Sequence, residues 1–323
     1  MYQELFTIPF LNIPIYGYGL MMVVAFLAAI QVAKWVAPKV GIDPEHFVNA
    51  AMIGLVAGIV GARLSHVLEN LPLYTRSDLS IAQNIFNAIN IRSGGLTFYG
   101  GFLLATPLCI VYAFRKKIPV LLGMDVVAIC LMVALGFGRI GCFLNGCCYG
   151  AECHLPWAVH FPYHSLPYQD QFADGQLTDV PSSLIAVAPD GRYILKSPAD
   201  FVGNPTLETQ ADQQRSLGLH PAQLYSTLTA FLIAGILYAF FTTRPRTGLV
   251  FALMLMIEGF SRFVLEMLRV EPAVVHIGPV GLSLSMVLGA AICITGVVFW
   301  VVLHKLRQRT TDVTSSGGVT PVV

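Results

Sequence analysis

Charged side chains are scarce in this chain. They make up 11% of its 323 residues, whereas hydrophobic residues make up 55%. A soluble domain usually carries about a quarter charged residues, so the composition excludes an ordinary soluble enzyme. The formal net charge is only +1, and we expect no nucleic-acid partner. A basic amino-terminal segment with a small-residue cleavage site is also missing, so we expect the first apolar segment to remain as an uncleaved anchor.

Long apolar segments take the place of the missing charge. A helix needs about 20 apolar residues to cross the hydrocarbon core of a bilayer. We therefore predict an all-α polytopic membrane protein with seven transmembrane helices. The predicted spans are Ile15–Ala33, Phe47–Ala62, Gly94–Phe114, Ile118–Phe137, Pro221–Thr243, a segment opening at Thr247, and Ile277–Leu303.

The basic residues between these spans predict the orientation. Cytoplasmic loops of membrane proteins carry an excess of Lys and Arg. With seven spans, four basic groups fall on one side, namely Lys34 with Lys39, Arg115–Lys117, Arg244 with Arg246, and Lys305 with Arg307 and Arg309. We therefore expect the amino terminus outside and the carboxyl terminus in the cytoplasm.

The predicted spans also divide the chain into four segments. Residues 1–138 hold spans one to four with an outer segment at about 70–93, in which Ile81–Ile91 is a candidate interfacial helix. Residues 139–220 form an outer glycine-rich loop and a small extracytoplasmic head with a few short strands. Residues 221–305 hold spans five to seven. Residues 306–323 are polar and predicted to be a disordered cytoplasmic tail.

The sixth span carries unusual charge. Glu258, Arg262 and Glu266 are spaced i, i+4 and i+8, and Arg269 follows three residues later, so they share one helical face. A charge at the bilayer centre costs about 2.5–3.5 kcal/mol on insertion scales. The pattern favours a polar functional cavity. The alternatives are a structural stripe of ion pairs or a helix end near the interface.

A glycine-rich stretch carries a further arginine. Five glycines stand between Gly136 and Gly150, with Arg139 among them. We predict that this stretch is a loop at the outer end of span four. There the planar guanidinium group of Arg139 can bind two phosphate oxygens at once. A solvated arginine in a flexible loop is the alternative.

Tyr99 stands between paired glycines at the start of span three, and Arg63 follows a face of glycines on span two. A phenol has an ordinary pKa near 10, so Tyr99 needs a cationic neighbour to act as a base but none to donate a hydrogen bond. An interfacial tyrosine is the alternative. Arg63 is either a further phosphate contact or the partner in an internal salt bridge.

Four of the seven cysteines cluster at 142–153, next to His154. The spacing lacks two Cys-x-x-Cys pairs, so it is a weak signal for zinc. A disulfide and free, packed thiols remain open. We expect no metal and no cofactor.

Motifs along nearly the whole chain resemble the bacterial prolipoprotein diacylglyceryl transferase family. They are Tyr18-Gly19-Leu20-Met21, Gly61-Ala62-Arg63-Leu64, Gly94-Gly95-x-x-Phe98-x-Gly100-Gly101, Gly138-Arg139-x-Gly141 through Asn145-Gly146 to Gly150, His220-Pro221-x-Gln223-Leu224-Tyr225, and Gly259-x-x-Arg262-Phe263-x-x-Glu266-x-x-Arg269.

The resemblance implies an activity and its partners. The family transfers diacylglyceryl from phosphatidylglycerol to the lipobox cysteine of preprolipoproteins, the first step of lipoprotein maturation in the bacterial inner membrane, and releases glycerol 1-phosphate. It implies that Arg139 binds the lipid headgroup and that Arg262 is a second essential arginine. Glu266 would orient an arginine or hold the active-site network, and Arg269 would gate it or neutralise charge nearby. Further contacts fall on matched motif positions: Tyr18, Arg63, Gly100, Gly150 and His220.

The sequence departs from the family's most familiar form. Tyr99 stands where that form has histidine, Cys142 where it has asparagine, and Cys147 where it has glutamate. The usual proton-accepting histidine is therefore missing, and Tyr99 or solvent hydroxide must deprotonate the thiol. This departure motivates the alternative of a non-catalytic or altered-specificity relative that binds phospholipid on the same scaffold.

Overall fold

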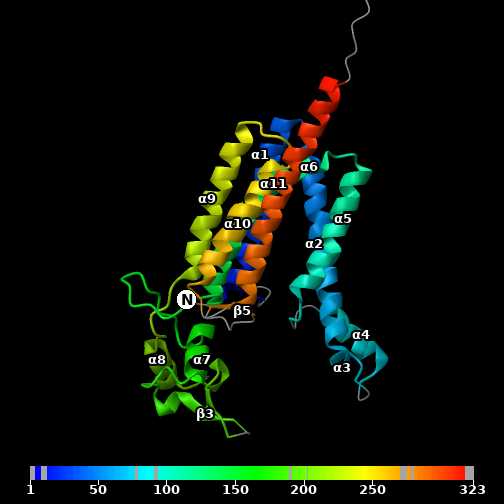
Figure 1. Ribbon diagram of the computed structural model, residues 1–323. Helices are drawn as coiled ribbons and strands as arrows, with labels where there is room; N and C mark the ends of the chain where they lie inside the picture. The colour runs from blue at the N-terminus through cyan, green and yellow to red at the C-terminus, as the bar shows by residue number, and fades with distance from the viewer. Residues whose placement is uncertain are drawn as a thin grey trace, which may run out of the picture. The chain divides into compact units, whose positions relative to one another are not determined.

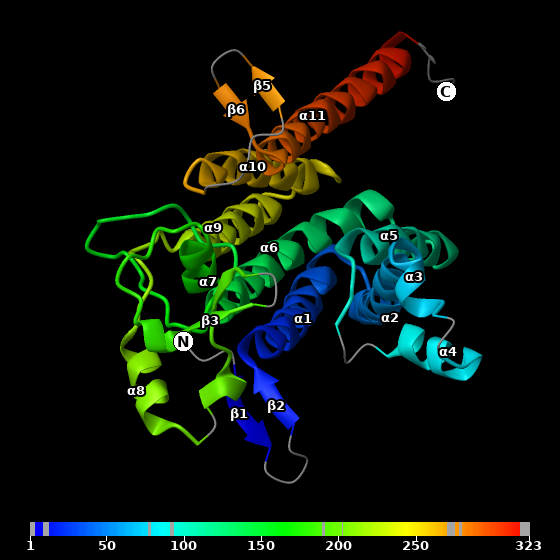
Figure 2. The same ribbon diagram turned by 90° about the horizontal axis from the view of Figure 1, so that it is seen from below.

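The computed structural model describes residues 4–8, 13–76, 79–90, 94–188, 191–201, 203–269, 275–277 and 280–316. It is mostly helical (Figures 1 and 2). The chain forms two compact units. The first comprises Met1–Ala29 with Ala128–Val323, and the second comprises Ile30–Val127.

The first unit holds three two-stranded antiparallel sheets among its described residues, together with the helices that carry the candidate site. Its elements are β1 (Glu4–Ile8), β2 (Ile13–Tyr16), most of α1 (Gly17–Val36), most of α6 (Val120–Asn145), α7 (Leu166–Ala173), η2 (Ser182–Leu184), β3 (Ile185–Val187), β4 (Tyr193–Leu195), η3 (Pro198–Phe201), α8 (Pro205–Gln213), α9 (Ala222–Thr242), α10 (Leu249–Glu266), β5 (Val275–Ile277), β6 (Val280–Leu282) and α11 (Leu284–Ser316).

The second unit is built around α2 and α5, which lie side by side (Figure 1). Its elements are the end of α1, η1 (Ala37–Val40), α2 (Pro44–Glu69), α3 (Leu71–Tyr74), α4 (Ile81–Ile89), α5 (Phe98–Arg115) and the beginning of α6. Glycines bring the two helices close together, since a Cβ atom on Gly61 would lie 2.8 Å from the Cβ of Leu104 and would overlap the Gly100 carbonyl. Small residues allow such close helix packing in membranes.

In the part of the chain that the structure describes, five helices are long and apolar enough to cross a membrane, which makes the chain a multi-pass membrane protein. They are α1 with η1, α2, α6, α9 and α11, and their mean hydropathy lies between 1.8 and 2.6. The apolar helix α5 is shorter, and α10 carries Glu258, Arg262 and Glu266. The predicted helix at Ile81–Ile91 is present as α4, capped at Ser80 and ending at Ile89.

The structure corrects three predicted boundaries. Helix α6 continues to Asn145, so Arg139 lies in a helix and not in a loop. The glycines there serve helix packing: a Cβ on Gly141 would lie 3.1 Å from Met21 on α1, and one on Gly136 would lie 2.7 Å from the ring of Phe231 on α9.

The last span begins later than predicted, because the β5–β6 hairpin precedes α11. The predicted disordered tail is wrong for residues 306–316, which continue α11 to Ser316. The remaining seven residues lie outside the described part of the chain.

Close packing of α10 on α11 fixes the rotation of α10 (Figures 1 and 2). A Cβ on Gly259 would lie 2.6 Å from the Gly289 carbonyl oxygen and 2.5 Å from the amide nitrogen of Cys293. Gly259 therefore faces α11. Successive helical residues are rotated by about 100°, so the neighbouring Glu258 points away from this contact.

Residues 151–220, here called the 151–220 subdomain, contain a small core of their own. Tyr163, Tyr168, Leu184 and Phe201 are buried together in it. The Tyr163 hydroxyl donates to the Leu184 carbonyl at 2.7 Å, and burial raises the pKa of this phenol to about 12. The predicted short strands are present as β3 and β4, which pair antiparallel.

Candidate functional site

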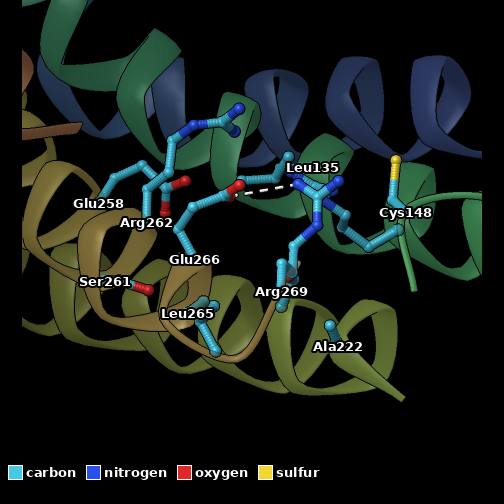
Figure 3. Close-up of a pocket in the computed structure, with 11 residues that line it drawn as sticks. Leu135, Cys148, Ala222, Glu258, Ser261, Arg262, Leu265, Glu266 and Arg269 are labelled. Atoms are coloured by element: carbon cyan, nitrogen blue, oxygen red, sulfur yellow. Dashed lines mark hydrogen bonds and ion pairs between the residues drawn. The ribbon is translucent and has the colours of Figure 1, made fainter. Parts of the chain in front are cut away.

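A polar pocket lies among α6, α9 and α10 within the first unit, and Figure 3 shows it in close-up. The residues that line it combine three arginines, two glutamates and two serines with a cysteine and small or apolar groups. They are Leu135, Arg139, Cys148, Ala222, Ser226, Glu258, Ser261, Arg262, Leu265, Glu266 and Arg269.

The charged residues of α10 lie on one face of the helix, as their spacing predicts. Glu258, Arg262 and Glu266 all line the pocket. Their side chains leave the helix on one side, whereas Ser261 and Leu265 lie toward α9 in the view of Figure 3. Gly259 packs on α11, and the neighbouring Glu258 points away from that contact into the pocket, where it meets the other two charges.

Arg139 reaches the same pocket from α6. Both Arg139 and Arg262 lie close enough to Glu258 to act on its charge. Arg139 and the α10 charges therefore line one pocket, and Arg139 is on a helix and not in the expected loop. A helix is the more rigid support, since it holds the Cα position of Arg139 relative to its neighbours.

Arg269 follows the end of α10 and completes the pocket. Its Nη1 donates to Oε2 of Glu266 at 3.2 Å, the contact drawn as a dashed line in Figure 3. The Glu266 side chain is 4% exposed and the Arg269 side chain is 20% exposed. An ion pair so shielded from water holds both groups firmly, and removing one partner would leave a buried charge.

The charges of the pocket match an anionic group. Three guanidinium groups face two carboxylates, which leaves an excess of one positive charge. Each guanidinium can form two parallel hydrogen bonds to a phosphate. The cavity between the side chains measures only about 20 Å³, enough for about one water molecule. A phosphate therefore requires the arginines to move apart.

A turn after α6 brings further groups to this pocket. Cys148 lines it, and Cys142 and Cys147 lie next to Cys148. Tyr18 on α1 packs against Gly141, where a Cβ would lie 3.3 Å from the Tyr18 ring. The charge of Arg139 acts on Tyr18. The structure thus places the predicted contact Tyr18 near Arg139.

Backbone hydrogen bonds at Gly150 and Ala151 tie the segment that carries Arg269 to the segment of His220. The Gly150 amide donates to the His220 carbonyl at 2.9 Å, and the Ala151 amide donates to the Leu268 carbonyl at 2.8 Å. A Cβ on Gly150 would lie 2.6 Å from the Cβ of His220 and 2.9 Å from the Leu268 oxygen. Neither residue lines the pocket, and both fix the backbone next to Arg269.

A second, larger cavity of about 600 Å³ lies on the side of the 151–220 subdomain. Cys148 and Arg269 line both cavities, so the two are neighbours. The second cavity also carries the carboxylates of Glu152, Asp170 and Asp174. The Tyr149 hydroxyl donates to Asp170 at 2.6 Å, and burial together with Asp170 raises the pKa of this phenol.

The sequence reasoning missed Ser226, Ser261 and Cys148 as pocket residues. Ser261 lies within one helical turn of Glu258 and Arg262, so its place beside the α10 charges carried a usable signal. Ser226 directly follows the motif that ends at Tyr225, but the packing of α9 on α10 decides whether it faces the pocket.

Three predicted site residues belong to the second unit, and there Arg63 has a complete set of backbone partners. It is 6% exposed. Its Nε donates to the Ala88 carbonyl at 2.8 Å and its Nη2 to the Asn87 carbonyl at 2.7 Å. Its Nη1 donates to the carbonyls of Gly94 and Gly95 at 2.7 and 2.9 Å. Four of its five N–H groups therefore bind backbone oxygens, a partner set that differs from both predicted alternatives.

The other two residues lie at the start of α5. Tyr99 is 61% exposed in the first helical turn. Gly100 packs against α2, where a Cβ would overlap Ser65 and lie 2.5 Å from the Gly61 oxygen. Gly100 thus acts in helix packing, and Arg63 holds the segment that leads into Tyr99.

Comparisons with known proteins give the family of the chain. A sequence model of the family described as prolipoprotein diacylglyceryl transferase matches residues 3–302. The chain is 28% identical to the phosphatidylglycerol–prolipoprotein diacylglyceryl transferase of Clostridium tetani, over 81% of this chain and 83% of that protein. It is also 28% identical to the enzymes of the same name from Corynebacterium glutamicum, over 93% and 83%, and from Burkholderia ambifaria, over 90% and 91%. The resemblance read from the motifs is confirmed, and the chain belongs to the prolipoprotein diacylglyceryl transferase family.

Proposed function

We propose that this protein transfers a diacylglyceryl group from phosphatidylglycerol to the lipobox cysteine thiol of prolipoproteins and releases glycerol 1-phosphate. The observation that carries the proposal is the pocket in which Arg139, Arg262 and Arg269 converge. The names of the related proteins support the same activity.

The reaction makes clear demands on such a pocket. The thiolate sulfur attacks an sp³ carbon of the lipid glycerol, a C–S bond forms, and the C–O bond to phosphate breaks. Negative charge then accumulates on the departing phosphate. Fixed cations aimed at that charge lower the barrier, and they act most strongly where water is excluded. Arginine suits this role because its planar fork binds two phosphate oxygens.

The arrangement suggests how the pocket residues divide the work. Arg139 and Arg262 bind the phosphate, and the charge of Glu258, on which both arginines act, keeps both guanidinium groups in place in the absence of lipid. Glu266 holds Arg269. When the lipid phosphate enters the narrow pocket, Arg269 moves from Glu266 toward it and acts as the gate. Gly150 and His220 support this motion by fixing the backbone beside Arg269.

The proton of the substrate thiol needs an acceptor. We assign it to the Tyr99 hydroxyl, because Tyr99 stands where the family's familiar form has histidine, or to hydroxide from solvent. Tyr18, beside Arg139, contributes to binding the headgroup. Arg63 and Gly100 act indirectly by shaping the start of α5.

We further propose seven spans in the bacterial cytoplasmic (inner) membrane. The five long apolar helices, the shorter α5 and the charged α10 together supply them. The positive-inside rule puts the amino terminus outside and the carboxyl terminus in the cytoplasm. The 151–220 subdomain is then an extracytoplasmic head. Its acidic cavity, next to Arg269, disfavours an anionic lipid and offers room for the signal peptide around the lipobox cysteine.

Lipidation of a lipobox peptide in phosphatidylglycerol liposomes tests the proposal. The wild type should add one diacylglyceryl group to the peptide thiol and release one glycerol 1-phosphate per peptide. Phosphatidylcholine liposomes should give no product. Arg215→Gln is a matched control, because Arg215 is exposed and binds backbone carbonyls of the 151–220 subdomain.

The main rival is a non-catalytic relative that binds phospholipid on the same scaffold, and the identity of Tyr99 motivates it. A folded wild type that binds phosphatidylglycerol without modifying the peptide would support this rival and overturn the transferase assignment. Equal activity in Arg139→Ala and in the Arg215→Gln control would show that the pocket takes no part in the reaction.

A further inference from the structure

Three cysteine thiols gather beside the arginine pocket. The sulfur atoms of Cys142, Cys147 and Cys148 all lie within 4.8 Å of one another. All three residues are half-buried, and each is a free thiol. The proposed transfer uses the thiol of its substrate and not these thiols, so their convergence calls for a separate explanation.

The end of α6 explains how two of the thiols meet. The Gly146 amide donates to the Phe143 carbonyl at 3.2 Å, and the Cys147 amide donates to the Cys142 carbonyl at 3.1 Å. Gly146 has a φ of 73°. These bonds form a Schellman motif, in which the second residue after the helix folds back on the last turn. Here the two residues that the motif brings together are Cys147 and Cys142.

The third thiol is brought in by an unusual backbone conformation. Cys148 has a φ of 60°, in the left-handed region that few residues other than glycine adopt. The neighbouring backbone is held in place from α9, because Nε2 of Gln223 donates to the Cys147 carbonyl at 2.8 Å. Gln223 is fully buried. The turn is thus positioned by contacts that do not involve the thiols.

We infer that Cys142, Cys147 and Cys148 form a binding site for a thiophilic metal ion of the zinc class. Zinc binds cysteine sulfur at about 2.3 Å, so tetrahedral ligands lie about 3.8 Å apart. Thiols within 4.8 Å of one another reach this spacing by small side-chain rotations. Three sulfur ligands leave one coordination position for water or another donor, and sulfur ligands favour zinc and softer ions over magnesium or calcium.

The site is coupled electrostatically to the arginine pocket. Cys148 lines that pocket together with Arg139 and Arg269, and the charges of both arginines act on Cys148. On binding, the three thiols release three protons to solvent, and the divalent ion with three thiolates carries a net charge of −1. This charge competes with a phosphate for the two arginines. Metal binding should therefore weaken the binding of phosphatidylglycerol.

Titration of the reduced, full-length protein with Cd²⁺ and Zn²⁺ tests the site without any substrate. Cd²⁺ should give the ultraviolet charge-transfer absorption of a cadmium thiolate at one ion per chain, and Zn²⁺ should displace it. Cys142→Ser and Cys148→Ser should each weaken binding by about tenfold or more, since even loss of groups behind the ligands costs about 10–100-fold. Cys109→Ser is the matched control, because Cys109 lies on α5 outside the cluster.

Two results would overturn the inference. One is reduced wild type without a saturable cadmium–thiolate signal. The other is binding that persists undiminished in Cys148→Ser. If the isolated protein carries a disulfide within the cluster and its reduced form binds no metal, the cluster is a disulfide site. Because these measurements use no lipid and no peptide, their outcome does not depend on the proposed transferase activity. If zinc raises the phosphatidylglycerol concentration needed for half-maximal lipidation, the result supports the predicted coupling between the metal site and the arginine pocket.

Discussion

Arg63 and Arg262 are both arginines on apolar helices of a membrane protein, yet their surroundings differ. Arg63 uses four of its N–H groups on backbone carbonyls and is nearly fully buried. Arg262 is half-buried in a pocket that it shares with two other arginines and two glutamates. A guanidinium group satisfied by backbone oxygens supports the fold, whereas one beside exchangeable charged partners can bind a ligand. The partners, and not burial alone, therefore distinguish the two roles.

Removing a pocket arginine should have the largest effect on activity. Arg139→Ala and Arg262→Ala should each lower the rate of peptide lipidation by about 100-fold or more, the scale seen when one group that stabilises transition-state charge is deleted. Thermal stability should change little, because both residues are half-buried. The Lys variants should recover only part of the rate, since lysine lacks the planar fork. Rates above one-tenth of wild type for both alanine variants would contradict the assignment.

Removing Arg63 should lower the stability of the protein and leave its binding of phosphatidylglycerol intact. Arg63→Ala leaves the carbonyls of Asn87, Ala88, Gly94 and Gly95 without their donor, and each unsatisfied buried group costs about 1–3 kcal/mol. The melting temperature should fall, and the remaining folded protein should still bind phosphatidylglycerol. Arg63→Lys should recover part of the stability. A variant of normal stability that no longer binds the lipid would instead make Arg63 a headgroup contact.

Neutralising Glu266 should have an intermediate effect. Glu266→Gln keeps the shape of the side chain but weakens the contact with Arg269 at 3.2 Å. Hydrogen bonds to charged groups contribute about 1.5–3 kcal/mol, so we expect activity to fall by about tenfold. Phosphatidylglycerol should bind as tightly as before or more tightly, because Arg269 is released. Unchanged activity with unchanged lipid affinity would show that this ion pair has no part in gating.

The smallest effect is expected for Tyr99→Phe. If the hydroxyl accepts or relays the thiol proton, lipidation should slow by less than about tenfold at neutral pH, since hydroxide can replace it. The loss should shrink as the pH is raised. A rate equal to wild type across the pH range would assign deprotonation to solvent alone.

Much of the fold followed from apolar length and charge spacing. The long helices, the capped helix α4 and the shared face of Glu258, Arg262 and Glu266 all agree with the sequence prediction. The end of α6 did not, because glycines that suggest a loop serve here to let α1 and α9 approach α6. Glycine alone does not distinguish a turn from close helix packing.

The site residues that could not be predicted are those placed by packing between segments far apart in the sequence. The family motifs marked Arg139, Arg262 and Glu266 as site residues one by one, but Ser226 and Cys148 reach the pocket only through the packing of α9 and the turn after α6. The cysteine cluster illustrates the same limit. Its spacing gives a weak metal signal, and only the helix-ending turn with the left-handed Cys148 brings the three thiols together. The partners of Arg63 are likewise backbone groups, which no side-chain pattern reveals.

Direct binding of phosphatidylglycerol tests the central claim that the pocket arginines hold the lipid phosphate. Native mass spectrometry of the wild type, Arg139→Ala and Arg63→Ala, each with equal amounts of phosphatidylglycerol and phosphatidylcholine, compares the two arginine environments. The account predicts a preference for phosphatidylglycerol in the wild type and in folded Arg63→Ala, and its loss in Arg139→Ala. Retention of the preference in Arg139→Ala together with its loss in Arg63→Ala would contradict the account.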